Sequence, residues 1–413
     1  MYRVRDPCNG PALYDYQMIV EEAAPRRGSS IGRLRHRSEK NEATGRRVSA
    51  FTATPRATLP LRILISRTDR IGDAVLALPL CGLLKARLGA HVIFLGSAYT
   101  RAVLEASDAV DTIVEWDDML PPADQLARIA EARADVVLHV FPRPAIARAA
   151  WAARIPWRCG TSHRLYHWLY CNRLEPLGRK RSSLHEAQLN VRVARSLLDA
   201  AALALPPDAL APYGRLCARV QVPAPIADLL QPDRFTLVVH PKSFESAREW
   251  PLSHYRALVN ALPPDRFRVL ITGTRKEGEA MHEWLSALPP HAHDVTGRTT
   301  LAELIALLGA VDGVVAASTG PLHIAAAAGT PVLGLYPRRS PMNVGRWAPL
   351  GPYASTLVPP TPCAHCGAGT RVRPVDSCAC VEAVSVDAVC AHVEAWAVED
   401  QVVGPSGAPG VEA

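Results

Sequence analysis

A polar turn between two apolar segments carries the residues best suited to hold an anion. It follows the apolar run 313–317 and leads into a helical pattern that begins with a proline. Ser or Thr can cap a helix here, glycine leaves the backbone amides accessible, and proline costs nothing at a helix start. Because the N-terminus of a helix attracts anions, the turn predicts a phosphate or diphosphate site. Its candidate ligands are Ser318, Thr319, Gly320 and His323.

A second loop of the same construction lies near the start of the folded region, between an apolar run and a helical pattern. It contains Arg67, Arg70, Gly72 and Asp73. The two arginines can bind an acidic or phosphorylated group, or they can screen Asp73 and lower its pKa. Each can instead be a solvated structural residue. Two such units, one in each half of the chain, predict two domains that face each other across a cleft.

Three segments resemble glycosyltransferase family 9, the ADP-heptose:lipopolysaccharide heptosyltransferases. They are 66–73 (SRTDRIGD), 240–255 (HPKSFESAREWPLSHY) and 317–327 (ASTGPLHIAAA), and they occur in the family's order. The resemblance extends from about Leu61 to about Val393. It implies an α/β fold of GT-B architecture, in which two Rossmann-like domains face each other. It also implies an inverting transfer of heptose from ADP-heptose to a lipopolysaccharide core or a related surface glycan.

The resemblance implies that Asp73 is the catalytic base, since the Ile-Gly-Asp motif holds the family's catalytic carboxylate. Transfer of a sugar to a hydroxyl requires a group that takes the hydroxyl proton. The alternative interpretation is an Asp that only favours the start of its helix.

The central segment resembles the family's donor-phosphate loop. Arg248 stands where the family has a Lys or Arg that reaches the donor phosphates, and positive charge there would stabilise the departing diphosphate. Ser243 and Ser246 are possible hydroxyl donors, and Lys242 is a neighbouring cation. Glu277, which follows a later strand, is a weaker candidate for the nucleotide ribose.

The turn at 318–323 matches the family's diphosphate turn at Thr319, Gly320 and His323, although His323 can instead pack its helix. Ser318 stands where many members have Asp. A serine can still cap the helix but carries no charge. Either the donor preference has changed, or this carboxylate is dispensable here.

No metal and no cofactor are expected at the site. The sequence contains no G-x-G-x-x-G after a strand, no phosphate-binding G-x-x-x-x-G-K-[ST] and no Asp-x-Asp. A GT-B enzyme typically holds the diphosphate with helix ends and cationic side chains. The cysteines near the C-terminus leave a separate structural metal open, because their spacing partly resembles a metal-ligand set: Cys363, Cys366, Cys378, Cys380 and Cys390.

Apolar runs and helical patterns alternate along both halves, which predicts parallel strands with crossover helices. In the first half, strands are expected at 62–66, 91–96, 112–115, 136–140 and near 155–160, with helices at 73–88, 99–106, 122–131, 146–152 and 183–201. In the second half, strands are expected at 235–240, 268–272, 293–295, 313–316 and after the helix that begins at Pro321, with helices at 252–262, from 277, and at 301–308. A proline-rich stretch, 205–225, is the expected hinge.

The composition sets the domain plan and the class of partner. A chain of 413 residues with 48% hydrophobic content can form two domains. We expect a disordered basic extension at 1–58, an acceptor-binding domain at 59–225, a nucleotide-sugar-binding domain at 226–400 and a flexible tail at 401–413. The net charge is +7, with basic clusters in 1–58 and 157–181. These can attract anionic lipid or a phosphorylated acceptor, while nucleic acid is disfavoured because no nucleic-acid motif accompanies them.

No secretory signal or spanning run is evident, so the expected location is cytoplasmic, peripheral at the inner membrane. The expected partners are a nucleotide-sugar donor, ADP-heptose above others, and a lipid-linked or phosphorylated glycan acceptor. Three alternatives remain open. The enzyme can use another nucleotide sugar, it can modify an autotransporter protein, or the chain can be a non-catalytic sugar-nucleotide-binding protein.

Overall fold

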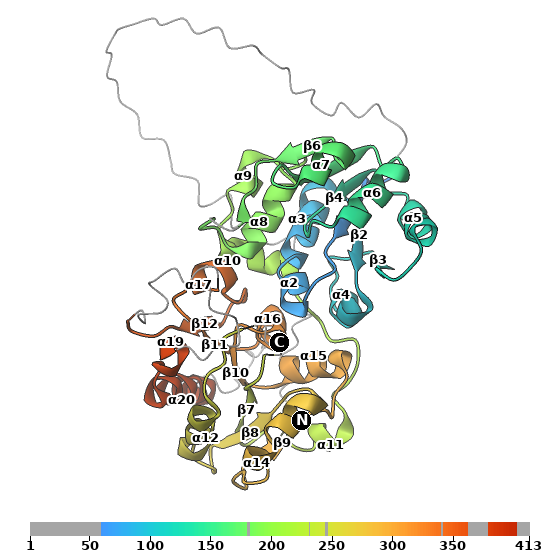
Figure 1. Ribbon diagram of the computed structural model, residues 1–413. Coiled ribbons are helices and arrows are strands. Elements are labelled where there is room, and N and C mark those ends of the chain that lie inside the picture. Colours follow the sequence, from blue (N-terminus) through green and yellow to red (C-terminus); the bar gives the residue numbers. More distant parts are fainter. Residues whose placement is uncertain are drawn as a thin grey trace, which may run out of the picture. The chain divides into compact units, whose positions relative to one another are not determined.

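Two parallel six-stranded sheets, each flanked by helices, organise this computed structural model (Figure 1). The structure describes residues 59–179, 182–230, 232–243, 247–339, 342–361 and 379–402. The predicted extension, the predicted tail beyond 402, and Ser246, Cys363, Cys366 and Cys378 lie outside these residues.

The first sheet has the order β3-β2-β1-β4-β5-β6. Its strands are β1 (Arg62–Ser66), β2 (His91–Gly96), β3 (Thr112–Glu115), β4 (Val136–Leu138), β5 (Trp157–Thr161) and β6 (Arg173–Glu175). The helices of this half are α2 (Ile71–Val75), α3 (Leu78–Leu88), α4 (Arg101–Glu105), α5 (Pro122–Glu131), α6 (Pro144–Ala152), α7 (Leu165–Tyr170), α8 (Glu186–Val193) and α9 (Ala200–Leu203), with a 3₁₀ turn, η1, at Ala98–Thr100.

The second sheet repeats the same topology, with the order β9-β8-β7-β10-β11-β12. Its strands are β7 (Phe235–His240), β8 (Phe267–Ile271), β9 (Ala292–Asp294), β10 (Gly313–Ala317), β11 (Val332–Leu335) and β12 (Ala354–Leu357). Its helices are α12 (Leu252–Ala261), α13 (Arg275–Ala280), α14 (His282–Leu285), α15 (Leu301–Ala310), α16 (Gly320–Ala327), α17 (Val344–Trp347), α19 (Ala379–Glu382) and α20 (Val386–Val402).

Both faces of each sheet are buried, which explains the continuous apolar runs that predicted parallel strands. In β1, Ile63 and Ile65 face the helices α3 and α8, while Leu64 faces the opposite layer with α5 and α6. The second sheet does the same. Leu237 packs with α12 and α20, and Val238 packs with α15 and α16.

The structure differs from the predicted elements at several places. The expected helix 73–88 is two helices, α2 and α3, because Pro79 has no N–H to continue the hydrogen-bond ladder across Leu76 and Ala77. The expected helix 183–201 is also divided, into α8 and α9. The short edge strands β6 and β12 and the helix α7 were not predicted.

The proline-rich stretch after α9 contains α10 (Pro207–Leu210), the 3₁₀ turn η3 (Ala211–Gly214) and α11 (Ala224–Ala227). It is packed against its surroundings. The amide of Leu216 donates to the Ala327 carbonyl at 3.0 Å, and that of Cys217 donates to the Ala106 carbonyl at 2.7 Å. The connection therefore contacts both halves. None of the helices in the described part of the chain is long and apolar enough to cross a bilayer.

Candidate active site

The two predicted loop-helix units meet directly. Helix α2 of the first half packs on α16 of the second through a pair of glycines. A Cβ on Gly320 would lie 2.8 Å from Cγ2 of Ile71, and a Cβ on Gly72 would lie 2.9 Å from Cδ2 of His323. Glycine is therefore required at both positions for close helix approach. This differs from the predicted reason for Gly320, which was access of a ligand to the backbone.

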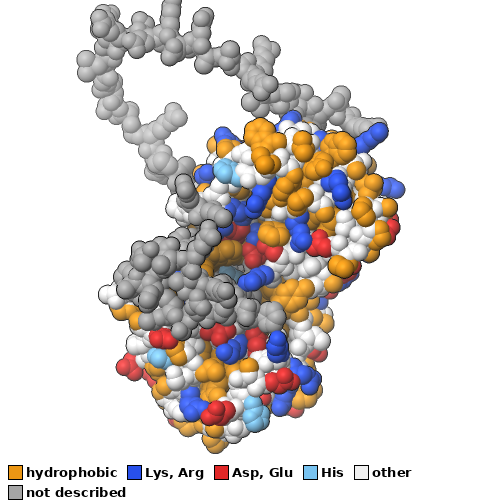
Figure 2. Space-filling view, in the orientation of Figure 1, with side chains coloured by type: hydrophobic (Ala, Val, Ile, Leu, Met, Phe, Trp, Pro, Cys, Tyr) orange, Lys and Arg blue, Asp and Glu red, His pale blue; other side chains and the backbone are white. Residues whose placement is uncertain are grey.

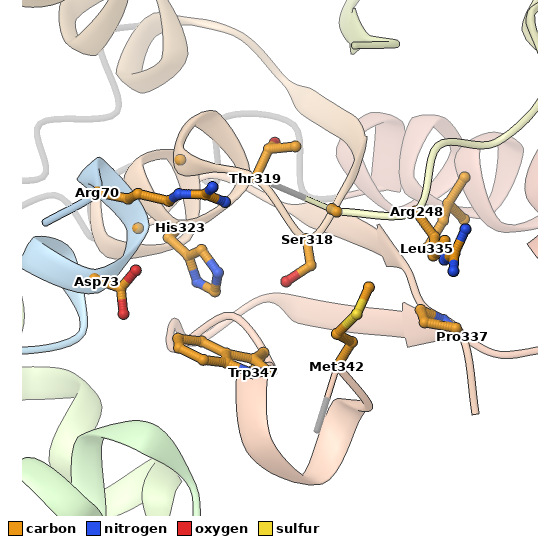
Figure 3. Close-up of a pocket in the computed structure, with 13 residues that line it drawn as sticks. Arg70, Asp73, Arg248, Ser318, Thr319, His323, Leu335, Pro337, Met342 and Trp347 are labelled. Atoms are coloured by element: carbon orange, nitrogen blue, oxygen red, sulfur yellow. The ribbon is translucent and has the colours of Figure 1, made fainter. Parts of the chain in front are cut away.

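A pocket of about 210 Å³ opens beside this contact. Whole small-molecule sites usually measure about 300–1,000 Å³, so this pocket is smaller than a typical complete site. In Figure 3, Asp73 and His323 lie at one side, Arg248 lies at the other, and Ser318 lies between them. The lining residues are Arg70, Gly72, Asp73, Ala247, Arg248, Ser318, Thr319, Gly320, His323, Leu335, Pro337, Met342 and Trp347.

Asp73 stands in the first turn of α2, where its side chain lines the pocket. Its carboxylate accepts a hydrogen bond from Nη2 of Arg67. Burial raises the pKa of Asp73 to about 6, and the positive charge of Arg67 opposes that rise without cancelling it. Arg67 therefore acts on this pKa in the expected direction, but desolvation is the larger effect and the net shift is upward.

Arg67 does not line the pocket; it lies behind Asp73, with only 3% of its surface exposed. Its Nη1 donates to Oε1 of Glu186 at 2.8 Å and to Oδ1 of Asn190 at 3.0 Å. Its Nε donates to Oδ1 of Asp69 at 3.0 Å. Arg67 therefore holds Asp73 in place from the protein side, and the acceptor contact predicted for Arg67 is not formed by this arrangement.

Glu186 is the centre of this charged cluster. It begins α8, is 1% exposed, and contacts three arginines. Burial alone would raise the pKa of Glu186, but Arg67, Arg179 and Arg346 lower it to about 2. The carboxylate is thus ionised at any physiological pH.

Arg346 brings the second half of the chain into the same cluster. It lies in α17, and its Nε donates to Oε2 of Glu186 at 2.8 Å. Its Nη1 donates to the carbonyl of Arg179 at 2.5 Å. A further bond between the halves joins Nε2 of His185 and the Ala348 carbonyl at 2.9 Å. The guanidinium of Arg346 also lies 5.3 Å from the ring of Trp347, which lines the pocket.

The diphosphate turn has the expected backbone form. Thr319 is the N-cap of α16 in an extended conformation, and Pro321 occupies the second helical position. The amides of Gly320 and Leu322 belong to the first turn, where no carbonyl of the helix can accept from them. The Thr319 hydroxyl makes no capping bond, and its buried oxygen has no hydrogen-bond partner among the described residues. The Ser318 side chain lines the pocket, and the Tyr336 hydroxyl donates to the Trp347 carbonyl at 2.5 Å.

Arg248 is the buried cation of the pocket. It is 4% exposed, and its Nη1 has no hydrogen-bond partner within the described ranges. A buried guanidinium nitrogen without a partner is costly, so an anionic ligand at this position would satisfy it. The neighbouring Lys242 is already paired with Glu249, at 2.8 Å between Nζ and Oε2, and does not line the pocket.

His323 lines the pocket and is 3% exposed. Burial, with a smaller contribution from His185, lowers its pKa to about 3, so the ring is neutral. Its Nδ1 has no hydrogen-bond partner in the described part of the structure. The ring therefore combines the two predicted roles: it packs beneath Gly72, and one nitrogen remains available to a ligand. Arg70 also lines the pocket and is exposed.

Two predicted ligands are not brought into the pocket. The Ser243 hydroxyl donates to the Ala247 carbonyl at 3.2 Å and to Oε1 of Glu249 at 3.0 Å, so it fastens its own loop. Oε2 of Glu277 accepts from the Thr274 amide at 2.7 Å in a capping box at the start of α13. That local capping role was recognisable from the Thr-x-x-Glu spacing.

The sequence did not single out Glu186, Arg179, Arg346 or Trp347. Glu186 stands at a helix start, where an acidic residue is ordinary, and Arg346 is 160 positions away from it. No local pattern connects such residues. The one feature of the sequence that pointed to this cluster was the excess of basic residues near 157–181, which includes Arg179.

The family model for glycosyltransferase family 9 (heptosyltransferase) matches residues 152–373. A Haemophilus influenzae protein provisionally named a glycosyltransferase is 25% identical over 300 residues, covering 70% of this chain and 86% of that protein. Lipopolysaccharide heptosyltransferase 2 of Escherichia coli is 32% identical over 102 residues, but this match covers only 24% of this chain and 29% of that protein.

Solved structures establish the fold. E. coli ADP-heptose lps heptosyltransferase II has a TM-score of 0.61 at 21% identity and covers 83% of this chain and 100% of its own. E. coli heptosyltransferase WaaC with ADP has a TM-score of 0.61 at 17% identity and covers 81% and 100%. The predicted GT-B architecture is thereby confirmed.

Proposed function

This chain belongs to glycosyltransferase family 9, and from that premise we propose that it is an inverting enzyme that transfers heptose from ADP-heptose to a lipopolysaccharide core or a related surface glycan. One observation carries the proposal. A single pocket combines a carboxylate from the first half, Asp73, with a buried arginine and an amide-rich helix start from the second, and Nη1 of this arginine has no partner among the described residues. These are the two groups that sugar transfer from a nucleotide requires.

In the proposed reaction, the acceptor hydroxyl oxygen bonds to the anomeric carbon while the bond from that carbon to the diphosphate oxygen breaks. Asp73 takes the hydroxyl proton. The departing diphosphate gains negative charge, which Arg248 and the amides of Gly320 and Leu322 would stabilise. Attack and departure on opposite faces of the sugar invert the configuration.

The electrostatics of Asp73 suit this role. A pKa of about 6 leaves the carboxylate ionised at neutral pH while keeping it a stronger base than an exposed Asp. Arg67 fixes its orientation through Nη2, and the three arginines and three carboxylates of the cluster balance in charge. The cluster therefore holds Asp73 in position for proton transfer, while its own charges cancel.

Chemistry and the relatives both support the proposed donor and acceptor. The structures of related enzymes include one with ADP and one with ADP-2-deoxy-2-fluoro heptose. We propose the same nucleotide here and a lipid-linked or phosphorylated glycan acceptor at the cytoplasmic face of the inner membrane. Arg70 is the pocket residue that would contact an acidic acceptor group, since it is exposed and comes from the first half.

A second donor is favoured by one residue. Ser318 stands at the predicted diphosphate turn without a charge, and it lines the pocket. A nucleotide sugar other than ADP-heptose would fit a turn that makes no charged contact with the sugar. The other residues of the mechanism would keep their roles.

A panel of nucleotide sugars tests the function. The purified protein is incubated with each donor and a deacylated core oligosaccharide, and release of the nucleoside diphosphate is measured. We expect turnover with ADP-heptose and much weaker turnover with UDP- and GDP-sugars. Turnover with another sugar alone would select the Ser318 alternative, and binding of ADP with no turnover for any donor would contradict an enzymatic role.

Metal independence is tested by ADP affinity with and without EDTA. We expect equal affinities, since Arg248 and the start of α16 would hold the diphosphate without a bridging ion. Restoration of lost affinity by added Mg²⁺ or Mn²⁺ would overturn this part of the proposal.

A further inference from the structure

An unusual group of apolar side chains projects from α6 and α7 of the first half. Leu165, Trp168 and Leu169 are 87%, 62% and 73% exposed, and Trp151 is 52% exposed. Single exposed apolar residues are ordinary, but a contiguous group marks an interaction site. We name these four residues the α6–α7 patch.

The patch is contiguous because of helix geometry and one ring contact. Leu165, Trp168 and Leu169 occupy positions i, i+3 and i+4 of α7, so they share one face. The ring of Trp151 lies 6.0 Å from that of Tyr170 at the end of the same helix. The opposite face of α7 is anchored by His167, whose Nδ1 accepts from the Thr161 amide at 2.9 Å. The apolar face is therefore held outward on a fixed helix.

The charges around the patch indicate which kind of partner it binds. From Pro144 to Glu175 the chain contains Arg148, Arg154, Arg158, Arg164 and Arg173 but one acidic residue, Glu175. Figure 2 shows basic side chains among the apolar ones over this part of the surface. Tryptophan, tyrosine and leucine amid arginines form the combination that binds the interface of an anionic bilayer, with apolar groups in the acyl boundary and cations at the headgroups.

We propose that the α6–α7 patch is the membrane-docking surface of this protein and that it binds anionic phospholipid headgroups. Its place in the fold suits that role. Helix α7 connects β5 to β6 of the sheet whose strand β1 leads to Asp73, so the patch belongs to the same half of the chain as the proposed base. Docking through α7 would bring the acceptor half to the membrane; that consequence rests on the proposed lipid-linked acceptor, whereas lipid binding itself does not.

Cosedimentation of the full chain with vesicles tests the proposal. Vesicles of phosphatidylcholine alone are compared with an equimolar mixture of phosphatidylcholine and phosphatidylglycerol. We expect binding to the mixed vesicles to be at least about tenfold stronger and to weaken as salt rises, because several arginines act near the surface. All variants keep residues 1–58, since that segment also carries basic residues.

Two variants separate the apolar and electrostatic contributions. Leu165→Ser with Leu169→Ser should weaken partitioning by at least about tenfold through lost apolar burial. Arg148→Gln with Arg164→Gln should weaken it by about fivefold for each arginine. Tyr353→Ser, an equally exposed side chain of the second half at 59%, is the control and should bind as the parent does. Melting temperature and transfer to a water-soluble acceptor should remain unchanged in all three.

Unchanged vesicle binding by the double leucine variant would overturn the proposal, as would equal binding of the parent to both vesicle types. Conversion of an oligomeric parent into monomers by the same variant would show instead that the patch joins two copies. If the parent does not transfer sugar, the proposed function is contradicted, but the vesicle-binding result is unaffected. The two failures can therefore be told apart.

Discussion

Asp73 is the residue on which the proposed chemistry depends most, because it is the carboxylate that lines the pocket beside the diphosphate turn. Asp73→Asn should retain the fold and ADP binding, since its shape and much of its helix-start preference remain. Transfer should fall by about 10²–10⁴-fold, the usual contribution of general-base catalysis. Melting temperature and transfer rate are measured on one preparation. Asp69→Asn is the matched control, since Asp69 also bonds Arg67 but lies outside the pocket lining.

The same residue predicts a pH dependence. Its folded-state pKa is raised to about 6, so the carboxylate is ionised and active above that value and is protonated below it. The transfer rate should therefore fall about tenfold per pH unit below pH 6 and level off above it. A profile that stays flat down to pH 5 would exclude Asp73 as the base, provided that the protein remains folded there.

Arg248 is expected to contribute strongly to nucleotide binding. Its removal should weaken ADP binding by about 1.5–3 kcal/mol, the range for a hydrogen bond to a charged group. Titration calorimetry of Arg248→Ala measures the loss. Lys242→Ala provides the comparison, because this cation lies close in sequence but is paired with Glu249. Equal losses in the two variants would mean that general charge, rather than the pocket position of Arg248, attracts the nucleotide.

At the scale of elements, the contact between α2 and α16 places the base beside the diphosphate turn. Gly320→Ala would put a Cβ 2.8 Å from Ile71 and should force the two helix starts apart, at a cost of about 1–3 kcal/mol. Stability and transfer should both fall, and Ile71→Ala in the same chain should restore part of each. Gly309→Ala is the matched change in α15, where the new Cβ meets only Ala328 at 3.8 Å. It should leave transfer unchanged.

At the scale of the whole molecule, Glu186 connects the two halves to the cluster around Asp73, the proposed base. Glu186→Gln leaves three arginines around a neutral side chain and should destabilise the fold by about 3–5 kcal/mol. It also removes a negative charge that raises the pKa of Asp73, so the acid limb of the rate profile should move to lower pH. Thermal unfolding and the profile of the folded fraction measure the two effects.

Exposed Glu105 supplies the control for this change, since its i,i+4 pair with Arg101 should contribute less than about 1 kcal/mol.

The parent protein should also lose stability in acid as Glu186 becomes protonated. Because the pKa of Glu186 is lowered to about 2 from 4.5, its contribution to stability is complete above pH 4.5 and is lost as pH falls through 2. If Glu186→Gln leaves the acid limb of the rate profile at the same pH, Glu186 does not influence the pKa of the proposed base.

The sequence by itself determined the class of fold and the parts of the site that are local in the chain. Apolar runs buried on both faces predicted parallel strands, and β1, β7 and β10 lie where expected. The turn before α16 and the loop before α2 each hold their backbone form within about ten residues. For that reason Asp73, Thr319 and Gly320 could be named as site residues, and their proposed roles remain predictions.

Only the tertiary structure decided which charges share a space and which direction their pKa values take. Ser243 and Glu277 are used by their own loops, and Arg67 is turned away from the pocket. Glu186 and Arg346 meet across 160 residues, and burial in the folded chain raises the pKa of Asp73. Desolvation and long-range ion pairing depend on the distance between elements in space, which no spacing along the chain records.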